Sequence, residues 1–389
     1  MAWSCREPGV RDAGLALRGA RVIVVSHGFQ PNYERGFTNG LARNGAHVTL
    51  ISSDRTEVSA LEPDVQALNL RGSQDSSRPA WRKALNMCRY HLSLLWLTLT
   101  RRRCTVHVTG LLMPVVWCGI LQALWFRVFS QHYVLTIHNL MPHGSHTRAA
   151  RFLYGLAYAI PDRIVVHTRL MRQQLIDEFK VGAERIVTME HGIEPLGSSV
   201  PSPPDMRTTG PLHLLFFGAL ERYKGLDILL QALSRDVPEF RLQIAGPCVD
   251  SSLAGDTEDA IHAHPHHDSI AWTRQFIPER DVPALFLNAD VLILPYRHID
   301  QSGVLFQALR YGLPVIAADV GSFRHYISEE VGEICERGDP EALAQALQKF
   351  ALRRGQYSRA RIQDIGRAYE WPHVVPVLAA AYVTGDRRS

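Results

Sequence analysis

The fold is decided by residues 295–321, PYRHIDQSGVLFQALRYGLPVIAADVG. In this stretch an apolar strand ends in a polar, glycine-containing turn, which opens a helix and returns to a second strand. Such a turn directs backbone N–H groups and a helix N-terminus at one point. That arrangement suits an oxygen-rich anion such as a nucleotide diphosphate.

A second segment of the same kind precedes it at residues 212–233, LHLLFFGALERYKGLDILLQAL. The pattern predicts a strand, a turn that carries Arg222 and Lys224, and a helix with apolar residues at helical spacing. Two such turns in one half of the chain, one cationic and one rich in backbone donors, indicate a nucleotide-sugar site.

Length and composition indicate two ordinary folded domains, because the chain has 389 residues and is 46% hydrophobic. The six cysteines are scattered without a C-x-x-C pair, which argues against a zinc site or a disulfide framework and favours a reducing, cytoplasmic setting. The N-terminal residues 1–14 mix acidic and basic residues without an apolar core, so we do not expect a secretion signal there.

Strand patterns alternate with helical patterns along both halves, which predicts β-α-β units and parallel sheets. We therefore expect an α/β protein of two doubly wound, Rossmann-like domains that face each other across a cleft, with ligands at the carboxyl ends of the strands. The expected boundaries are 1–195 for an acceptor-binding domain, 196–211 for a Pro- and Ser-rich linker and 212–365 for a donor-binding domain. The strands are expected at 21–26, 47–52, 104–110, 133–138, 163–168 and 185–190, and then at 212–218, 240–246, 269–274, 290–295 and 314–319.

The net charge of +4 hides an asymmetry between the two halves. Residues 1–195 carry 23 basic and 14 acidic side chains, whereas residues 196–389 carry 19 and 24. Residues 76–161 contain ten basic residues and no acidic one, and apolar residues interleave with the charges in 81–103. This favours contact with an anionic membrane surface, or with an anionic acceptor, over nucleic acid. The residues concerned are Arg82, Lys83, Arg89, Arg101, Arg102 and Arg103.

Two plainer interpretations stay open for this region. The basic helix at 81–103 is equally compatible with a core helix whose charged side is solvated. Residues 111–126, LLMPVVWCGILQALWF, are too short to span a bilayer and are interrupted by Pro114 and Gln122, so we expect a buried helix there.

Several of these motifs together resemble the retaining family 4 glycosyltransferases of the GT-B fold, also described as group 1. The resemblance rests on FFGALERYKGLDILLQAL at 216–233, SGVLFQALRYGLPVIAADVG at 302–321, TIHN at 136–139 and EHGIEP at 190–195. It also includes WPHVVPVLAAAYV at 371–383, so that residues 366–389 are expected to cross back onto the first domain. The likeness covers the chain from Arg21 onward.

The resemblance implies transfer of a sugar from a UDP- or GDP-linked donor, with no cofactor and no metal. Lys224 would contact the donor phosphates, beside Gly218 and with Arg222 as the second cation, and would stabilise the charge on the departing diphosphate. Asp300 or Gln301 would contact the sugar hydroxyls, although Asp300 is equally suited to cap the next helix. The backbone N–H groups of Ser302, Gly303, Val304 and Leu305 would cradle the sugar and phosphate.

The chain departs from the family pattern at two donor contacts. Ala219 stands where the family has an arginine, and Gln307 aligns with the second of two glutamates, the one that holds the nucleotide ribose. A glutamine side chain still accepts a hydrogen bond there, without charge.

In the first domain the resemblance makes His138, at the end of the strand 133–138, an active-site residue, although a histidine in this place is often structural. After the first strand, His27 or Glu34 would serve as a general base, and Gly28 or Gly36 would allow close approach of the acceptor. A retaining enzyme needs no strong base, whereas His27 keeps an inverting mechanism open.

The leading hypothesis is a cytoplasmic glycosyltransferase that acts on a glycan or a lipid-linked acceptor in polysaccharide or glycoconjugate biosynthesis. The basic first half adds peripheral association with the inner membrane face to this hypothesis. A catalytically silent binding subunit is the alternative that Ala219 and Gln307 suggest, and a nucleotide-sugar epimerase of the same fold also remains. A nicotinamide-dependent oxidoreductase is disfavoured, because G-x-G-x-x-G follows none of the expected strands.

Overall fold

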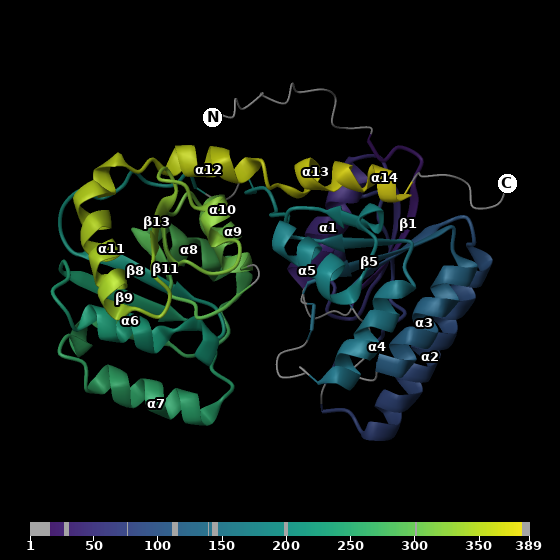
Figure 1. Cartoon of the computed structure of the whole chain (residues 1–389), viewed down its shortest axis with the longest axis horizontal. Coiled ribbons are helices and arrows are strands. Elements are labelled where there is room, and N and C mark those ends of the chain that lie inside the picture. Colours follow the sequence, from purple (N-terminus) through teal and green to yellow (C-terminus); the bar gives the residue numbers. More distant parts are fainter. Residues whose placement is uncertain are drawn as a thin grey trace. The chain divides into compact units, whose positions relative to one another are not determined.

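The structure is a computed structural model that describes residues 16–26, 31–75, 77–110, 116–138, 140–141, 147–197, 201–299 and 302–382. The chain divides into two compact units (Figure 1). Unit 1 is Met1–Gly192 with Glu370–Ser389, and unit 2 is Ile193–Tyr369.

Unit 1 is built on a seven-stranded parallel sheet with the order β3-β2-β1-β4-β5-β6-β7. Ile23 of β1 pairs with Thr49 of β2 on one side and with Val106 of β4 on the other, so the strand order reverses between β1 and β4. In doubly wound sheets, ligands bind beyond the carboxyl ends of the strands at such a switch point. The strands are β1 Arg21–Ser26, β2 His47–Ile51, β3 Gln66–Leu68, β4 Thr105–Thr109, β5 His132–Ile137, β6 Arg163–Val166 and β7 Ile186–Thr188.

The two faces of this sheet pack against different helices. In β1, Val22 and Val24 join a core with α1 (Pro31–Arg43) and the C-terminal segment, whereas Ile23 and Val25 join a core on the opposite face. The alternation follows from the two-residue period of a strand. The C-terminal segment contains α13 Trp371–Val374 and α14 Ala379–Tyr382, and the helices of the opposite face are α2 Ala80–Thr100, α3 Val116–Phe129, α4 Arg148–Ala159 and α5 Arg169–Phe179.

Unit 2 repeats this architecture with six parallel strands in the order β10-β9-β8-β11-β12-β13. The order reverses between β8 and β11, where Leu214 pairs with Val291. The strands are β8 Leu212–Phe217, β9 Phe240–Ala245, β10 Ile270–Thr273, β11 Val291–Leu294, β12 Val315–Ala318 and β13 Gly332–Cys335. The helices are α6 Leu226–Leu233, α7 Ser251–His262, α8 Val282–Asn288, α9 Gly303–Arg310, α10 Phe323–Tyr326, α11 Pro340–Arg353 and α12 Arg359–Arg367.

The predicted α/β class with two parallel, doubly wound sheets is confirmed. Two short strands at sheet edges, β3 and β13, were not predicted from the sequence, because three or four residues show no clear alternation. Residues 201–211, within the predicted linker, contain neither helix nor strand, and Arg207 Nε donates to Asp290 Oδ1 at 3.0 Å.

The prediction of a buried helix within 111–126 is only partly right for the residues that the structure describes. Ile120, Ala123 and Phe126 of α3 are buried, but Leu121 and Leu124 are exposed by 68% and 46%. No helix in the described ranges combines the length and the apolar character needed to cross a bilayer.

The predicted role of Gly36 in admitting an acceptor is contradicted, because the indole of Trp371 occupies the space beside it. A Cβ atom added at Gly36 would lie 2.0 Å from Trp371 Nε1, and one at Gly40 would lie 2.8 Å from Trp371 Cβ. These glycines let the C-terminal segment approach α1 closely.

We expect Gly36→Ala to lower the free energy of unfolding by about 1–3 kcal/mol, because the added methyl group displaces the Trp371 indole. Gly155→Ala on α4 is the matched control. Its added Cβ meets only Phe179 Cδ1 at 3.9 Å, so the gain in helix propensity leaves stability unchanged or raises it by up to about 1 kcal/mol. Urea unfolding followed by circular dichroism measures both, and equal effects would contradict the packing described.

His107 in β4 makes unit 1 sensitive to acid. Its Nδ1 lies 2.6 Å from Tyr382 Oη and its Nε2 lies 2.7 Å from Thr136 Oγ1. Burial, together with a smaller contribution from His167, lowers the pKa of this imidazole from 6.5 to about 3. The folded state therefore binds fewer protons than the unfolded state between these two pH values, and the stabilisation present above pH 6.5 is lost as the pH falls.

We therefore expect the free energy of unfolding to fall by about 2 kcal/mol more in the wild type than in His107→Gln between about pH 7.5 and about pH 5. Urea titrations at the two pH values measure the difference. Parallel losses in the two proteins would show that His107 does not carry this part of the acid sensitivity.

Candidate functional site

The predicted donor residues of unit 2 lie at the carboxyl edge of its sheet, on the turns after β8 and β11. These strands are parallel neighbours, so the turns that begin at Gly218 and Pro295 lie side by side. A Cβ atom added at Gly218 would lie 2.8 Å from Lys224 Nζ and 3.7 Å from Val304 Cγ2. The structure thus brings Gly218, Lys224 and Val304 together, from segments far apart in the sequence.

Glycines set the path of both turns. Gly218 and Gly225 have φ values of +100° and +71°, which side chains with a Cβ atom adopt at a cost. A Cβ atom at Gly225 would also lie 2.1 Å from the carbonyl oxygen of Pro295. Together the two glycines permit the close approach that places Lys224 beneath the first turn.

Lys224 ends the 3₁₀ turn Arg222–Lys224 (η4) and is only 6% exposed. Burial lowers the pKa of its ammonium from 10.5 to about 8, and the charge of Glu221 opposes this shift. The ammonium lies 6.0 Å from the centre of the Tyr296 ring, and the ion pairs of the described residues include none to Lys224. A buried cation without a close counter-ion is costly, and an anionic ligand would relieve that cost.

The second turn ends at Ser302, the buried N-cap residue of α9. Its side chain makes no capping hydrogen bond to the first turn of α9 within the described chain, so it does not use the N–H groups of Gly303 and Val304. Such N–H groups suit an anion. Asp300 and Gln301 lie outside the described residues.

Two further side chains complete this edge of unit 2. Gln307 Oε1 on α9 is buried and accepts no hydrogen bond from any described residue, which leaves an acceptor for a ligand hydroxyl. Burial raises the pKa of Tyr296 well above its usual range, and the nearby Ser302 side chain opposes the shift. Tyr296 and Glu221 were not predicted as site residues from the sequence, although both lie on the same two turns.

Arg222, predicted as the second donor cation, points elsewhere. Its side chain is 62% exposed, lies 3.3 Å from Asp256 of α7 and 4.0 Å from Asp250, and has no described contact with Lys224 or Val304. The arginine that follows β11, Arg297, is paired with Asp227. Lys224 is therefore the one predicted donor cation that the structure brings to the turn.

In unit 1, His138 follows β5 and belongs to a histidine cluster at the carboxyl edge of the sheet. Its ring centre lies 4.6 Å from that of Tyr33 and 5.1 Å from that of His167. His191 completes the cluster, 5.5 Å from His167. The sequence analysis gave no role to His167 or His191, although His167 follows β6 directly, as His138 follows β5.

Two members of this cluster are neutral at pH 7. Burial lowers the pKa of His167 to about 4 and that of His191 to about 3. His167 Nδ1 lies 3.0 Å from the carbonyl oxygen of Met189, so Nδ1 donates and Nε2 accepts from the Tyr33 hydroxyl at 3.4 Å. The cluster forms an uncharged, aromatic surface against which His138 packs, and His138 itself is only half-buried.

Of the predicted general bases, only Glu34 is described. It lies on α1, is 4% exposed, and its Oε1 is 3.8 Å from Arg71 Nη1. The Glu34 carboxylate is thus buried and engaged in an ion pair within unit 1. His27 and Gly28 lie outside the described residues.

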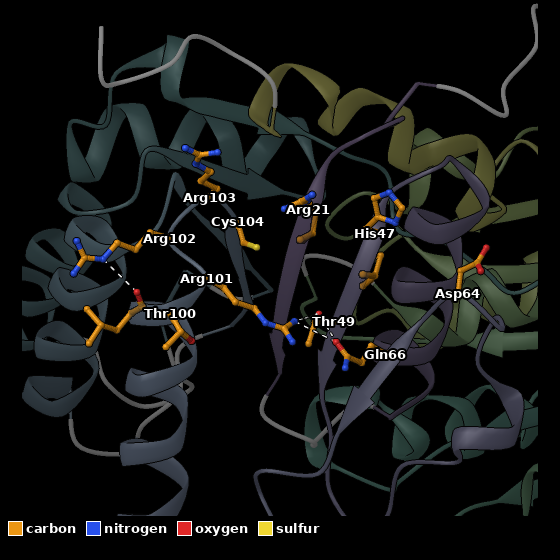
Figure 2. A pocket seen from close by; sticks show the side chains of 13 residues that line it. Arg21, His47, Thr49, Asp64, Gln66, Thr100, Arg101, Arg102, Arg103 and Cys104 are labelled. Carbon is orange, nitrogen blue, oxygen red and sulfur yellow. Dashed lines mark hydrogen bonds between the residues drawn. The ribbon is translucent and has the colours of Figure 1, made fainter.

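The six basic residues predicted for an acceptor or membrane face fall into two groups. Arg82, Lys83 and Arg89 are exposed on α2, whereas Arg101, Arg102 and Arg103 follow its C-terminus. Figure 2 shows the second group in a pocket of about 660 Å³ that is also lined by Arg21 and His47 at the amino ends of β1 and β2. This pocket is at the edge of the sheet opposite to the histidine cluster.

Comparison with known families identifies the class of protein. The family described as Glycosyl transferases group 1 matches residues 206–368, and the family described as Glycosyltransferase Family 4 matches residues 30–195. The chain therefore belongs to the group 1 glycosyltransferase family, as the sequence motifs indicated.

The curated relatives of the chain are glycosyltransferases with different names and substrates. It is 28% identical over 236 residues to a D-inositol 3-phosphate glycosyltransferase of Geodermatophilus obscurus, covering 57% of this chain and 52% of the relative. It is also 28% identical over 222 residues to a GDP-mannose:glycolipid 4-beta-D-mannosyltransferase of Xanthomonas campestris pv. campestris, covering 55% and 58%. The chain thus spans somewhat more than half the length of these relatives.

Solved structures agree on the fold. A sucrose-phosphate synthase from Thermosynechococcus elongatus has a TM-score of 0.71 at 18% identity, over 94% of this chain and 98% of that one. Anabaena HepE in complex with UDP has a TM-score of 0.69 at 13% identity, over 93% and 99%. At these identities the likeness establishes the two-domain GT-B fold.

The buried ammonium gives a test that needs no ligand. Since the folded pKa of Lys224 is lowered to about 8, its charge destabilises the fold fully below that pH, and the penalty disappears as the pH rises towards 10.5. We expect Lys224→Met to raise the free energy of unfolding by about 1–3 kcal/mol at pH 7 and by less near pH 10. Urea unfolding at both pH values measures this, and a destabilised variant at pH 7 would contradict the assigned environment.

Proposed function

We propose that this protein is a glycosyltransferase that moves a sugar from a nucleoside-diphosphate-linked donor to a glycan or a lipid-linked acceptor, in polysaccharide or glycoconjugate biosynthesis. The observation that carries the proposal is the buried Lys224 ammonium beside Gly218 and Val304, without an ion-pair partner among the described residues. A diphosphate at this turn would supply the missing negative charge.

In the proposed reaction, the bond between the sugar carbon and the diphosphate oxygen breaks, and the acceptor oxygen forms the new bond. Lys224 and the N-terminal N–H groups of α9 stabilise the charge on the departing diphosphate. Gln307 accepts a hydrogen bond from the nucleotide ribose. The proposal includes no metal or other cofactor, because Lys224 and the N–H groups of α9 supply the positive charge for the departing diphosphate.

We infer retention of configuration, with the acceptor proton passing to the leaving phosphate oxygen. Family likeness supports this, and the Glu34 carboxylate, the one predicted base among the described residues, is engaged with Arg71. The inverting alternative depends on His27. His138, above the neutral histidine cluster, is proposed to contact the donor sugar or the acceptor.

The relatives suggest the chemistry of the two substrates. The Xanthomonas relative is named for GDP-mannose and a glycolipid, the Geodermatophilus relative for an inositol phosphate, and HepE binds UDP. A UDP- or GDP-linked donor and an anionic or lipid-linked acceptor fit these names. The excess of basic residues in 1–195 favours a negatively charged acceptor.

A binding subunit without catalysis is the second candidate, because Ala219 and Gln307 replace charged residues of the family pattern. The two candidates differ in one measurable respect. The enzyme hydrolyses or transfers the sugar of a bound donor slowly even without its natural acceptor, whereas the silent subunit leaves every donor intact.

The donor site is tested by thermal unfolding with UDP, GDP and ADP. We expect one of them to raise the melting temperature of the wild type by mass action, and its shift to disappear in Lys224→Met. Arg222→Met is the matched control, because the Arg222 side chain pairs with Asp256 instead. We expect it to keep the shift.

Two results would count against this donor site. Equal loss of the shift in Arg222→Met and Lys224→Met would remove the distinction between the two cations. Undiminished binding of the diphosphate by Lys224→Met would place the phosphates elsewhere.

A further inference from the structure

We propose that unit 1 docks on an anionic lipid bilayer through the outer face of α2, α3 and α4, here called the docking face. The described chain has sixteen large apolar side chains that are exposed, and ten of them lie on these three helices and define the docking face. They are Trp81, Leu85, Met87, Leu92 and Trp96 of α2, Leu121, Leu124 and Val128 of α3, and Phe152 and Leu156 of α4.

Helix α2 is apolar on two opposite sides. Tyr90 and Leu94 face the sheet and are at most 5% exposed. At helical spacing on the other side lies a stripe whose members are 63% to 68% exposed. A surface helix of a globular protein normally carries polar residues there. The stripe consists of Trp81, Leu85, Leu92 and Trp96.

The neighbouring helices extend this stripe into a surface. Helix α3 contacts both α2 and α4, and the three lie side by side in Figure 1. Trp125 Nε1 of α3 donates to Thr98 Oγ1 of α2 at 2.9 Å, which fixes these two helices together. Leu121 and Phe152 are exposed by 68% and 66%. Exposed apolar surfaces of this extent mark interaction sites.

The positive charge around the docking face favours a negatively charged partner. Residues 77–161, which include all three helices, contain no acidic side chain. The Arg82 guanidinium lies 5.1 Å from the centre of the Trp81 ring, and that of Arg102 lies 5.3 Å from the Phe129 ring. Cations beside aromatic rings suit the headgroup region of a bilayer with anionic lipids.

The same charge disfavours a second copy of this chain. A two-fold interface brings identical patches together, so Arg82 and Arg89, which flank the stripe on α2, would approach their counterparts without acidic partners from these helices. Anionic phospholipids instead pair with every one of these cations.

The geometry indicates binding at the surface rather than insertion across the bilayer. No described helix meets the requirements for spanning, and the inner side of α2 is committed to the core of unit 1. The exposed apolar side chains reach the acyl boundary while the sheet stays outside. Arg101, Arg102 and Arg103, at the C-terminal end of α2, extend the basic rim to the pocket of Figure 2.

The proposal is tested by flotation of the full chain with phosphatidylcholine vesicles, with or without about 30 mol% phosphatidylglycerol. We expect the wild type to float with the anionic vesicles and to lose binding in high salt. The double variant Leu92→Ser/Trp96→Ser should bind them at least about tenfold more weakly. The double variant Phe276→Ser/Leu352→Ser is the control, since these exposed residues lie in unit 2 and are 77% and 87% exposed. It should float like the wild type.

Three outcomes would overturn the proposal. The wild type stays with the soluble fraction for both kinds of vesicle, or Leu92→Ser/Trp96→Ser floats as well as the wild type. A dimer seen by sedimentation without lipid, and dissociated by the same double variant, would assign the face to a second copy. Diphosphate binding, measured in parallel, depends on unit 2 alone, so failure of the docking face and failure of the donor site are distinguishable.

Discussion

The burial of the Lys224 ammonium is the constraint on which the rest of the site depends. A lysine in the 3₁₀ turn after β8 is placed beneath Gly218 only because Gly218 and Gly225 adopt left-handed backbone conformations. Burial then lowers the pKa of Lys224 to about 8, so the fold holds a cation for which the described residues provide no ion pair. The fold gives up stability there, as functional sites commonly do, and under the proposed function this cost is matched by affinity for the donor diphosphate.

The two units use the same edge of a similar sheet for different chemistry. Unit 2 presents a cation and helix N–H groups, which suit phosphate. Unit 1 presents His138 above two imidazoles, His167 and His191, that burial keeps neutral. An uncharged aromatic surface suits a sugar ring and its hydroxyl groups better than it suits a phosphate. The difference fits a donor diphosphate in one unit and an acceptor, or the transferred sugar, near the other.

The sequence predicted both sheets and the meeting of Gly218, Lys224 and Val304, because strand alternation and glycine-bearing turns are local signals. It did not predict the direction of Arg222, since its partner Asp256 lies on α7, a separate element. The pairing of Glu34 with Arg71 and the filling of the space at Gly36 by Trp371 are likewise tertiary contacts. The exposure of Leu92 and Trp96 could not be predicted from the sequence either, because an apolar residue does not reveal whether its side of the helix packs against other elements.

The most direct measurement of the central claim is the pKa of Lys224 by NMR on protein with isotopically labelled lysine side chains, with and without the nucleoside diphosphate that binds. The chain has only four lysines, and Lys224→Met assigns the signal. The account predicts a pKa near 8 in the free protein, which rises when the diphosphate binds because an adjacent anion favours the charged form. A free-protein pKa at the usual lysine value that does not change with the nucleotide would contradict it.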